Sequence, residues 1–390
     1  MAGMSTRRAR VLRLLVIAGA LGGVAYWFSA PHIRSAALLL DLTGAAPHIR
    51  TWLPVARHDV SSEDVTVPTR TLSIAARVYR PAHARGPALL IFPGIHGGGV
   101  DEPRLVSMAR QLAAAGGTVI TVPLPDLRAY RITVRSVDMI EDAIRWAAPA
   151  FGTGGRIGVA GISFAGGLTL VAAGRPGVSD HLTSVFTLGA HADLPRVLRY
   201  LCGEGAPASL PPPHDYGVVL FLRESLKHVV PAEQIPALNH ALVTFLDASS
   251  AEGMAPDRAR QLFDAARAEA AVLPEPSNRL MRAVNARDVR TLGRALAAFA
   301  EEVGGAPELS PSRSPATHAR VFLLHGTGDS VIPSTETLAL QEYLTARGNA
   351  PVQVLLTPLV THADARADVP FGDTWRLIRF WTRLWESLER

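Results

Sequence analysis

Ser163 is a candidate nucleophile, because it stands in the run Gly161-Ile-Ser-Phe-Ala165-Gly between two segments of different periodicity. A short apolar run precedes it and a small-residue-rich segment with helical spacing follows it, which predicts a strand, a tight turn and a helix. Such a turn holds the serine in a strained conformation and projects its hydroxyl towards solvent. The motif is imperfect, since Ala165 stands where the second glycine is usual. An ordinary strand-to-helix turn with an incidental serine is the alternative interpretation.

Three further stretches carry the residues that such a nucleophile needs. A serine hydroxyl reacts at neutral pH only when a base takes its proton, and the oxyanion that then forms needs preformed donors. A glycine-rich loop, an aspartate in a Gly-Thr-Gly-Asp turn and a late histidine could supply these groups. Each stretch lies at the carboxyl end of a predicted strand: Phe92-Pro-Gly-Ile-His-Gly-Gly-Gly99, His325-Gly-Thr-Gly-Asp329-Ser-Val-Ile-Pro333 and Leu359-Val-Thr-His362-Ala-Asp364.

With these four stretches in this order, the chain resembles the α/β-hydrolase superfamily over roughly residues 60–390, apart from a helical insertion. In that superfamily the nucleophile, the acid and the histidine follow one another along the chain. The resemblance therefore implies Ser163 as the nucleophile, Asp329 as the acid and His362 as the base. The histidine would take the serine proton and later protonate the leaving group, while the aspartate would fix the imidazole tautomer.

The resemblance also implies an oxyanion hole made of backbone N–H groups. One donor would be the N–H of Phe164, and the other an N–H of the glycine-rich loop, at Ile95 or His96. The acid has a rival in Asp193, which follows the preceding predicted strand, because some members of the superfamily place the acid there. We favour Asp329, since the residues after it look like the acid loop of the superfamily.

The remaining polar residues of these stretches have simpler interpretations. His191 and His325 follow apolar runs and are expected to be buried and hydrogen-bonded, whereas His96 could order its own loop. Asp364 is expected to be solvated. The glycine-rich loop lacks the patterns of nucleotide-binding loops, and histidines and carboxylates lack metal-ligand spacing, so we expect neither a cofactor nor a metal.

Strands that alternate with helices predict a mostly parallel α/β sheet with helices on both faces, preceded by two antiparallel edge strands at Val65–Thr69 and Leu72–Tyr79. The later strands are expected at Ala88–Phe92, Thr118–Val122, Ile157–Ala160, Ser184–Leu188, Val321–Leu324 and Val352–Leu356, and the helices at Arg104–Ala115, Val134–Ala148, Glu336–Ala346 and Trp375–Leu388.

Residues 195–317 interrupt this rhythm with proline clusters and helical patterns, notably Pro256–Ala271 and Val289–Val303. The strand–helix rhythm resumes afterwards, which favours a helical cap inserted into one domain over a separately folding domain. The predicted organisation is an N-terminal targeting segment at 1–30, a linker with a short helix at 31–59, the hydrolase core at 60–194 and 318–390, and the cap at 195–317.

The N-terminus looks like a targeting signal, because four arginines precede the uncharged apolar run Leu14–Phe28. A basic flank of this kind keeps the N-terminus in the cytoplasm. We favour an uncleaved signal anchor, with the catalytic domain outside the cytoplasm, over a cleaved signal peptide and an exported protein.

The composition excludes several function classes. The net charge of +5 comes almost wholly from scattered arginines, since Lys227 is the only lysine, and this pattern does not favour nucleic-acid binding. Cys202 is the only cysteine, so no intrachain disulfide can form. The hypothesis is a membrane-anchored serine hydrolase that cleaves a carboxylic ester, with a lipid-like ester as one candidate substrate. Its alternatives are an amidase, peptidase or acyltransferase with the same triad, or a catalytically silent scaffold that binds a ligand at the membrane.

Overall fold

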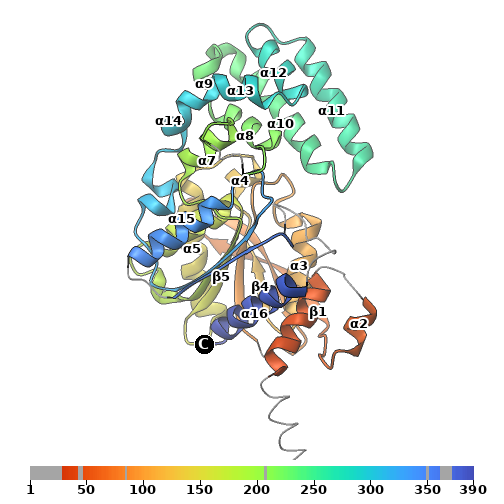
Figure 1. The fold of residues 1–390 in the computed structure, drawn as a ribbon, viewed down its shortest axis with the longest axis vertical. Helices are drawn as coiled ribbons and strands as arrows, with labels where there is room; N and C mark the ends of the chain where they lie inside the picture. Colours follow the sequence, from red (N-terminus) through yellow and green to blue (C-terminus); the bar gives the residue numbers. More distant parts are fainter. Residues whose placement is uncertain (1–28, 43–46, 84–85, 206–208, 348–350, 361–370) are drawn as a thin grey trace, which may run out of the picture.

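A central sheet organises the protein, and its eight described strands follow the order β1-β2-β4-β3-β5-β6-β7-β8 (Figure 1). The structure is a computed structural model that describes residues 29–42, 47–83, 86–205, 209–347, 351–360 and 371–390. Every pair of neighbours beyond β2 and β4 runs parallel. The strands are β1 Val60–Pro68, β2 Ser73–Pro81, β3 Ala88–Phe92, β4 Thr118–Thr121, β5 Ile157–Ile162, β6 Leu182–Leu188, β7 Arg320–Gly326 and β8 Val352–Thr357.

The first two strands form the expected antiparallel hairpin, but only β1 lies at the edge of the sheet. β2 also pairs with β4, through Arg77 to Tyr79, so the expectation of two edge strands is wrong for β2. Alternating apolar and polar residues show that one face of a strand is exposed to solvent. An interior strand of an antiparallel sheet can have such a face too, so the pattern does not identify an edge strand. In β2, Ile74, Ala76 and Val78 face the core and are buried. On the other face Ser73 and Ala75 are exposed, whereas Tyr79 is buried.

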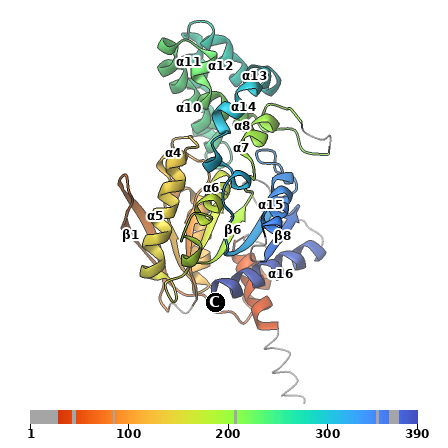
Figure 2. The same cartoon turned by 90° about the vertical axis from the view of Figure 1, so that its left-hand side faces the viewer.

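Helices cover both faces of the sheet, as the alternating pattern predicts (Figures 1 and 2). One face packs against α5, α6 and α15, and the other against α3, α16 and a helix at residues 29–42. Strands β3 and β4 are buried along their whole length because both of their faces are covered. The helix bounds are α3 Pro103–Ala114, α5 Val134–Phe151, α6 Phe164–Ala173, α15 Thr335–Ala346 and α16 Phe371–Leu388.

Between β6 and β7 the described chain is helical and stands as a cap over one end of the sheet (Figure 1). The expected helix Pro256–Ala271 is present as α11, whereas the expected helix at Val289–Val303 is broken into α13, η4 and α14. The break lies at Ala297–Phe299, which adopts a 3₁₀ turn. The helices are α7 Leu194–Leu201, α8 Asp215–Glu224, α9 Leu226–Val229, α10 Ile235–Ala251, α11 Pro256–Ala271, α12 Ser277–Asn285, α13 Val289–Leu296 and α14 Ala300–Gly304.

The helix at residues 29–42 docks on α16 at the end of the protein opposite the cap (Figures 1 and 2). Leu38 is buried there, Ser35 accepts a hydrogen bond from Thr382 at 2.9 Å, and the rings of His32 and Trp375 stack. Two short helices, this one and α2 at Pro47–Trp52, thus occupy part of the expected linker. The expected anchor at 1–30 lies almost wholly outside the described residues. Within the described ranges, no helix has the length and apolar character to cross a membrane.

Candidate active site

Ser163 occupies a sharp turn between β5 and α6, with φ of 57° and ψ of −131°. A positive φ is strained for a serine, and the surrounding hydrogen bonds hold it. The Ser163 N–H donates to the Leu188 carbonyl at 2.7 Å, and the Ser163 carbonyl accepts from the N–H of Gly166 at 2.8 Å. The expected strand, turn and helix around Ser163 are therefore confirmed.

Small residues make this turn sterically feasible. A Cβ atom on Gly161 would lie 2.6 Å from the Cα of Gly166, so the strand and the helix could not approach as they do. A Cβ atom on Gly166 would lie 2.9 Å from the Cβ of Ala190, in the loop after β6. Ala165 is fully buried without displacing either segment, because the close contacts fall at its glycine neighbour. The missing second glycine of the motif thus leaves the geometry of the turn intact.

The glycine-rich loop after β3 lies directly against the Ser163 turn. A Cβ atom on Gly94 would lie 3.1 Å from the Cβ of Ser163 and 3.2 Å from the carbonyl oxygen of Ile162. Phe164, whose N–H is the other expected oxyanion donor, begins α6. The N–H groups of a first helical turn have no acceptor inside the helix, and they lie at its positive end. The loop that carries Ile95 and His96 therefore lies beside the turn from which Phe164 begins α6.

His96 folds back onto its own loop. Its Nδ1 accepts a hydrogen bond from the N–H of Gly98 at 3.0 Å. Burial lowers the pKa of His96, and the neighbouring Arg104 adds to this effect, which together outweigh the attraction of Glu102. A neutral ring with Nδ1 as acceptor matches the expected role of ordering the loop.

Asp329 is held rigidly in the turn after β7. The residue is 1% exposed, and its Oδ1 accepts hydrogen bonds from the N–H groups of Val331 at 2.8 Å and Ile332 at 3.0 Å. Its Oδ2 lies 3.4 Å from Nε2 of His325 and faces Gly189, where a Cβ atom would be 3.3 Å away. Two backbone N–H groups thus fix the orientation of this side chain.

The two histidines that follow apolar runs are buried and hydrogen-bonded, as expected. His325 Nδ1 lies 2.6 Å from the hydroxyl of Thr337, and its Nε2 lies 2.9 Å from the carbonyl of Ile332. His191 Nε2 lies 2.8 Å from the carbonyl of Leu309. Each ring therefore joins a core strand end to another segment, which is a structural role.

Asp193 is engaged at the base of the cap. Its Oδ1 accepts from the N–H of Arg196 at 2.9 Å and so caps α7, and its Oδ2 accepts from Nε of Arg313 at 2.7 Å. The backbone directly before α7 is held as well, because the buried carboxylate of Glu336 accepts hydrogen bonds from the N–H groups of Ala192 and Asp193. Both oxygens of Asp193 thus hold the entry to the cap.

His362 and Asp364 lie outside the described residues. The described chain after β8 continues to Val360, and Leu359 donates its N–H to the hydroxyl of Thr357 at 3.2 Å. β8 pairs with β7 so that Thr357 lies opposite Gly326, three residues before Asp329. The carboxyl ends of β7 and β8, after which the expected acid and the expected base follow in the sequence, therefore lie side by side.

Known proteins give a limited comparison. No family model matches the chain, and neither does any curated protein. A hyperthermophilic esterase from the archaeon Pyrobaculum calidifontis superposes with a TM-score of 0.45 at 18% identity, over 92% of this chain and 90% of that one. A thermostable carboxylesterase from a metagenomic library gives 0.45 and 15%, over 86% and 92%. An acylaminoacyl peptidase from Pyrococcus horikoshii gives 0.46 and 12%, over 86% and 43%.

The topology decides the fold class. A mostly parallel sheet lies between two helical layers, a strained serine turn follows β5, and a helical insertion separates β6 from β7. The chain has the α/β-hydrolase fold. In this hydrolase fold the loops after β3, β5 and β7, with their candidate site residues, all leave the carboxyl edge of the sheet.

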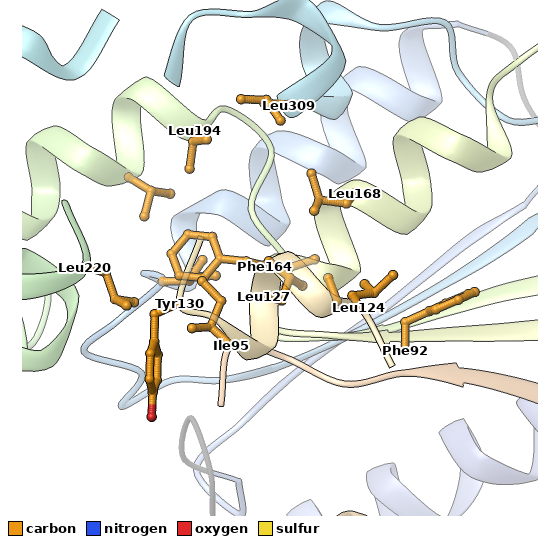
Figure 3. Close-up of a cluster of buried hydrophobic side chains, with 14 of the residues drawn as sticks. Phe92, Ile95, Leu124, Leu127, Tyr130, Phe164, Leu168, Leu194, Leu220 and Leu309 are labelled. Atoms are coloured by element: carbon orange, nitrogen blue, oxygen red, sulfur yellow. The ribbon is translucent and has the colours of Figure 1, made fainter. Parts of the chain in front are cut away.

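A small apolar pocket lies next to the serine turn of the hydrolase fold, between core and cap. Phe164 reaches into it, and Figure 3 shows this ring among Ile95, Tyr130, Leu194 and Leu220. Glu224 borders the same pocket, and burial raises the pKa of its carboxyl group despite the nearby Arg131. The full lining is Tyr130, Ile132, Phe164, Leu194, Leu198, Leu201, Gly217, Leu220, Phe221, Glu224 and Val303.

Three polar residues close to the glycine-rich loop were not singled out by the sequence. Tyr216 donates its hydroxyl to the Ile95 carbonyl at 3.1 Å, and Tyr130 donates to Oδ1 of Asp247 at 2.6 Å. They belong to segments far apart in the chain, and none lies in a recognisable motif. Among the described residues no group of three potential metal-ligating side chains comes together.

Proposed function

We propose that the protein is a serine hydrolase that cleaves carboxylic esters through an acyl-serine intermediate. One observation carries the proposal: Ser163 is held at positive φ at the start of α6, with the Gly94 loop packed against it. A strained serine between a helix N-terminus and a second loop of backbone N–H groups has the arrangement that stabilises an oxyanion. A structural serine in an ordinary turn needs neither the strain nor the second loop.

In the acylation step, the Ser163 hydroxyl would attack the ester carbonyl carbon while His362 takes its proton. A bond forms from Oγ to the carbon, and the carbonyl oxygen becomes an oxyanion. The N–H of Phe164 and an N–H at Ile95 or His96 would donate to it. The oxyanion then collapses, the bond to the alcohol oxygen breaks, and protonated His362 gives its proton to that oxygen.

In the deacylation step, water would attack the acyl-serine and give its proton to His362. The second tetrahedral intermediate releases the carboxylic acid, and the proton returns to Ser163. Asp329 would orient the imidazole and stabilise its charged form. Two backbone N–H groups hold one carboxylate oxygen of Asp329, and this also fixes the position of the other oxygen. The fixed orientation supports this role.

The pocket bordered by Phe164 and Leu198 supports an apolar acyl group. The same triad could cleave an amide or transfer the acyl group to another acceptor, but no separate observation favours those reactions or a silent scaffold. Fold alone does not name a substrate.

The test is a fluorophosphonate probe on the full-length chain, beside Ser163→Ala and His362→Ala. Labelling of the parent that is lost in both variants, together with hydrolysis of p-nitrophenyl esters, would support the proposal. A folded parent that takes up no label and cleaves no ester would refute it. Esters of increasing chain length, run beside matched amides, would then separate the acyl preference from the leaving-group preference.

We also propose that residues 1–30 anchor the chain and leave the catalytic domain outside the cytoplasm. The arginine flank and the uncharged run Leu14–Phe28 support this. An anchor there would be connected to the hydrolase core by the helix at residues 29–42, which lies at the end of the protein opposite the cap (Figure 1). A substrate from solution would then reach the cap more readily than a lipid within the same bilayer. Protease digestion of intact and opened cells would reveal which side of the membrane holds the domain.

A further inference from the structure

We infer that Tyr216, on helix α8 of the cap, is a positioning residue that sets the direction of an oxyanion-hole N–H. The inference rests on the proposed function, and it assigns the second donor of the hole. It implies that the cap is part of the catalytic machinery as well as a cover.

The argument begins with the peptide bond that joins Ile95 to His96. The Tyr216 hydroxyl donates to the Ile95 carbonyl at 3.1 Å. That carbonyl and the N–H of His96 belong to one planar unit, and in a trans peptide they point in opposite directions. A hydroxyl that fixes the carbonyl therefore also fixes the direction of the His96 N–H. Of the two candidate donors of this loop, His96 is therefore the one whose N–H direction the Tyr216 contact sets.

The residue after His96, Gly97, packs closely against one core residue and one cap residue. A Cβ atom on Gly97 would lie 2.7 Å from the hydroxyl oxygen of Tyr130 and 2.9 Å from Oδ1 of Asp247. Tyr130 donates to that carboxylate oxygen at 2.6 Å, and Asp247 belongs to α10 of the cap. The side chain of Arg128 donates to the Gly97 carbonyl at 3.1 Å. The loop is thus fixed on both sides of His96.

Helix α8 also holds the neighbouring loop after β4. Arg223 lies seven residues after Tyr216, which places the two on the same face, two turns apart. Its guanidinium donates to the carbonyl of Tyr130 at 3.1 Å, and Tyr130 has a positive φ of 59°. The rings of Tyr130 and Tyr216 meet edge to face, with centroids 6.4 Å apart. One face of α8 therefore contacts both the glycine-rich loop and the loop after β4.

The Tyr216 hydroxyl remains a neutral donor at any pH at which a hydrolase works. Burial raises its pKa well above the ordinary value, and the nearby Tyr130 and Asp247 add to the shift. Its contact with the loop is therefore set by the position of the cap and not by titration.

The experiment compares Tyr216→Phe with the parent, both full-length, on p-nitrophenyl butyrate and with a trifluoromethyl ketone inhibitor. Removing an oxyanion donor outright costs about 10²–10³ in kcat, and loosening one should cost less, so we expect kcat to fall roughly 10-fold. KM should change less than about twofold, because the donor acts on the transition state. Inhibition by the ketone, whose tetrahedral adduct carries the oxyanion, should weaken by the same factor as kcat.

Tyr343→Phe is the matched control, because that hydroxyl also donates to a backbone carbonyl, that of Ser314, but outside the oxyanion loop. Its kcat should match the parent. Tyr130→Phe is the second variant should Tyr216→Phe fail to fold, and it should lower kcat in the same manner. An unchanged kcat and an unchanged ketone affinity in a folded variant would overturn the inference, as would a rise in KM alone. A parent that neither hydrolyses esters nor labels at Ser163 would instead remove the proposed function, and this inference with it.

Discussion

A methyl group on Gly94 would come within 3.1 Å of the Cβ of Ser163, so the glycine-rich loop and the Ser163 turn lie in direct contact. Because backbone hydrogen bonds hold the Ser163 turn, the Gly94→Ala change should push the loop away by a few tenths of an ångström. Catalysis is sensitive to such displacements, and we expect kcat to fall about 10-fold or more with little change in KM.

The control for this change is Gly253→Ala in the cap, where an added Cβ atom meets open space. Ester hydrolysis by purified protein measures both variants, and thermal unfolding shows whether each retains its fold. Full activity of Gly94→Ala would contradict the prediction, because it would mean that the position of this loop does not matter for catalysis and that the loop supplies no N–H donor to the oxyanion.

The choice between the two candidate acids can be tested by a pair of amide substitutions. Asp329→Asn should lower kcat by about 10³–10⁴, because the amide would stabilise the wrong tautomer of the base. Asp193→Asn should leave most of the activity and keep the cap of α7, because an asparagine oxygen can still accept from the N–H of Arg196. It should lower the free energy of unfolding by at most about 1 kcal/mol, through the weakened pair with Arg313. Kinetics and urea unfolding of both variants give the answer, and the reverse pattern would make Asp193 the acid.

Local sequence patterns predicted those parts of the protein that depend on neighbouring residues. Apolar runs and helical spacing predicted the strands and helices of the core, since burial of one face imposes its period on the residues. The serine turn could be expected because the glycine at Gly161 and the small residues after Ser163 are a steric requirement of the turn itself.

Contacts between distant segments could not be predicted in this way. Tyr216 and Ile95 are 121 residues apart, and neither residue type nor spacing marks the hydroxyl as a partner of the loop. The interior position of β2 depends on its pairing with β4. The alternation of apolar and polar residues within β2 alone does not reveal that pairing. The two hydrogen bonds to Asp329 were likewise invisible, because they come from backbone N–H groups that every sequence offers.

Stability at acid pH should depend on Glu141, on α5. Burial by itself would raise its pKa, but hydrogen bonds from Arg175, Arg145 and Arg70 outweigh this and lower the pKa to about 2. A depressed pKa means that the folded state favours the charged form, so its stabilising effect is present above pH 4.5 and is lost as the pH falls towards 2.

The Glu141→Gln variant should therefore be less stable than the parent at pH 7 and should lose less stability between pH 4.5 and pH 2. Thermal unfolding across this range measures the difference. Glu63→Gln is a suitable control, since that carboxylate forms only an exposed pair with Arg80. Parallel curves for Glu141→Gln and the parent would contradict the prediction.

The pocket beside Phe164 should set the length of the acyl group that the enzyme accepts. Leu198 borders this pocket and is 4% exposed, so Leu198→Phe would place additional volume where a chain would lie. Each methylene in an apolar pocket is worth about 1–3 kcal/mol of discrimination. We expect kcat/KM for a hexanoate ester to fall at least 10-fold relative to the parent, while kcat/KM for an acetate ester changes by less than about threefold. Leu292→Phe also overpacks the cap, but that residue does not border the pocket, so it separates a local steric effect from a general loss of stability. An equal loss on both esters, or the same profile in both variants, would place the acyl chain elsewhere.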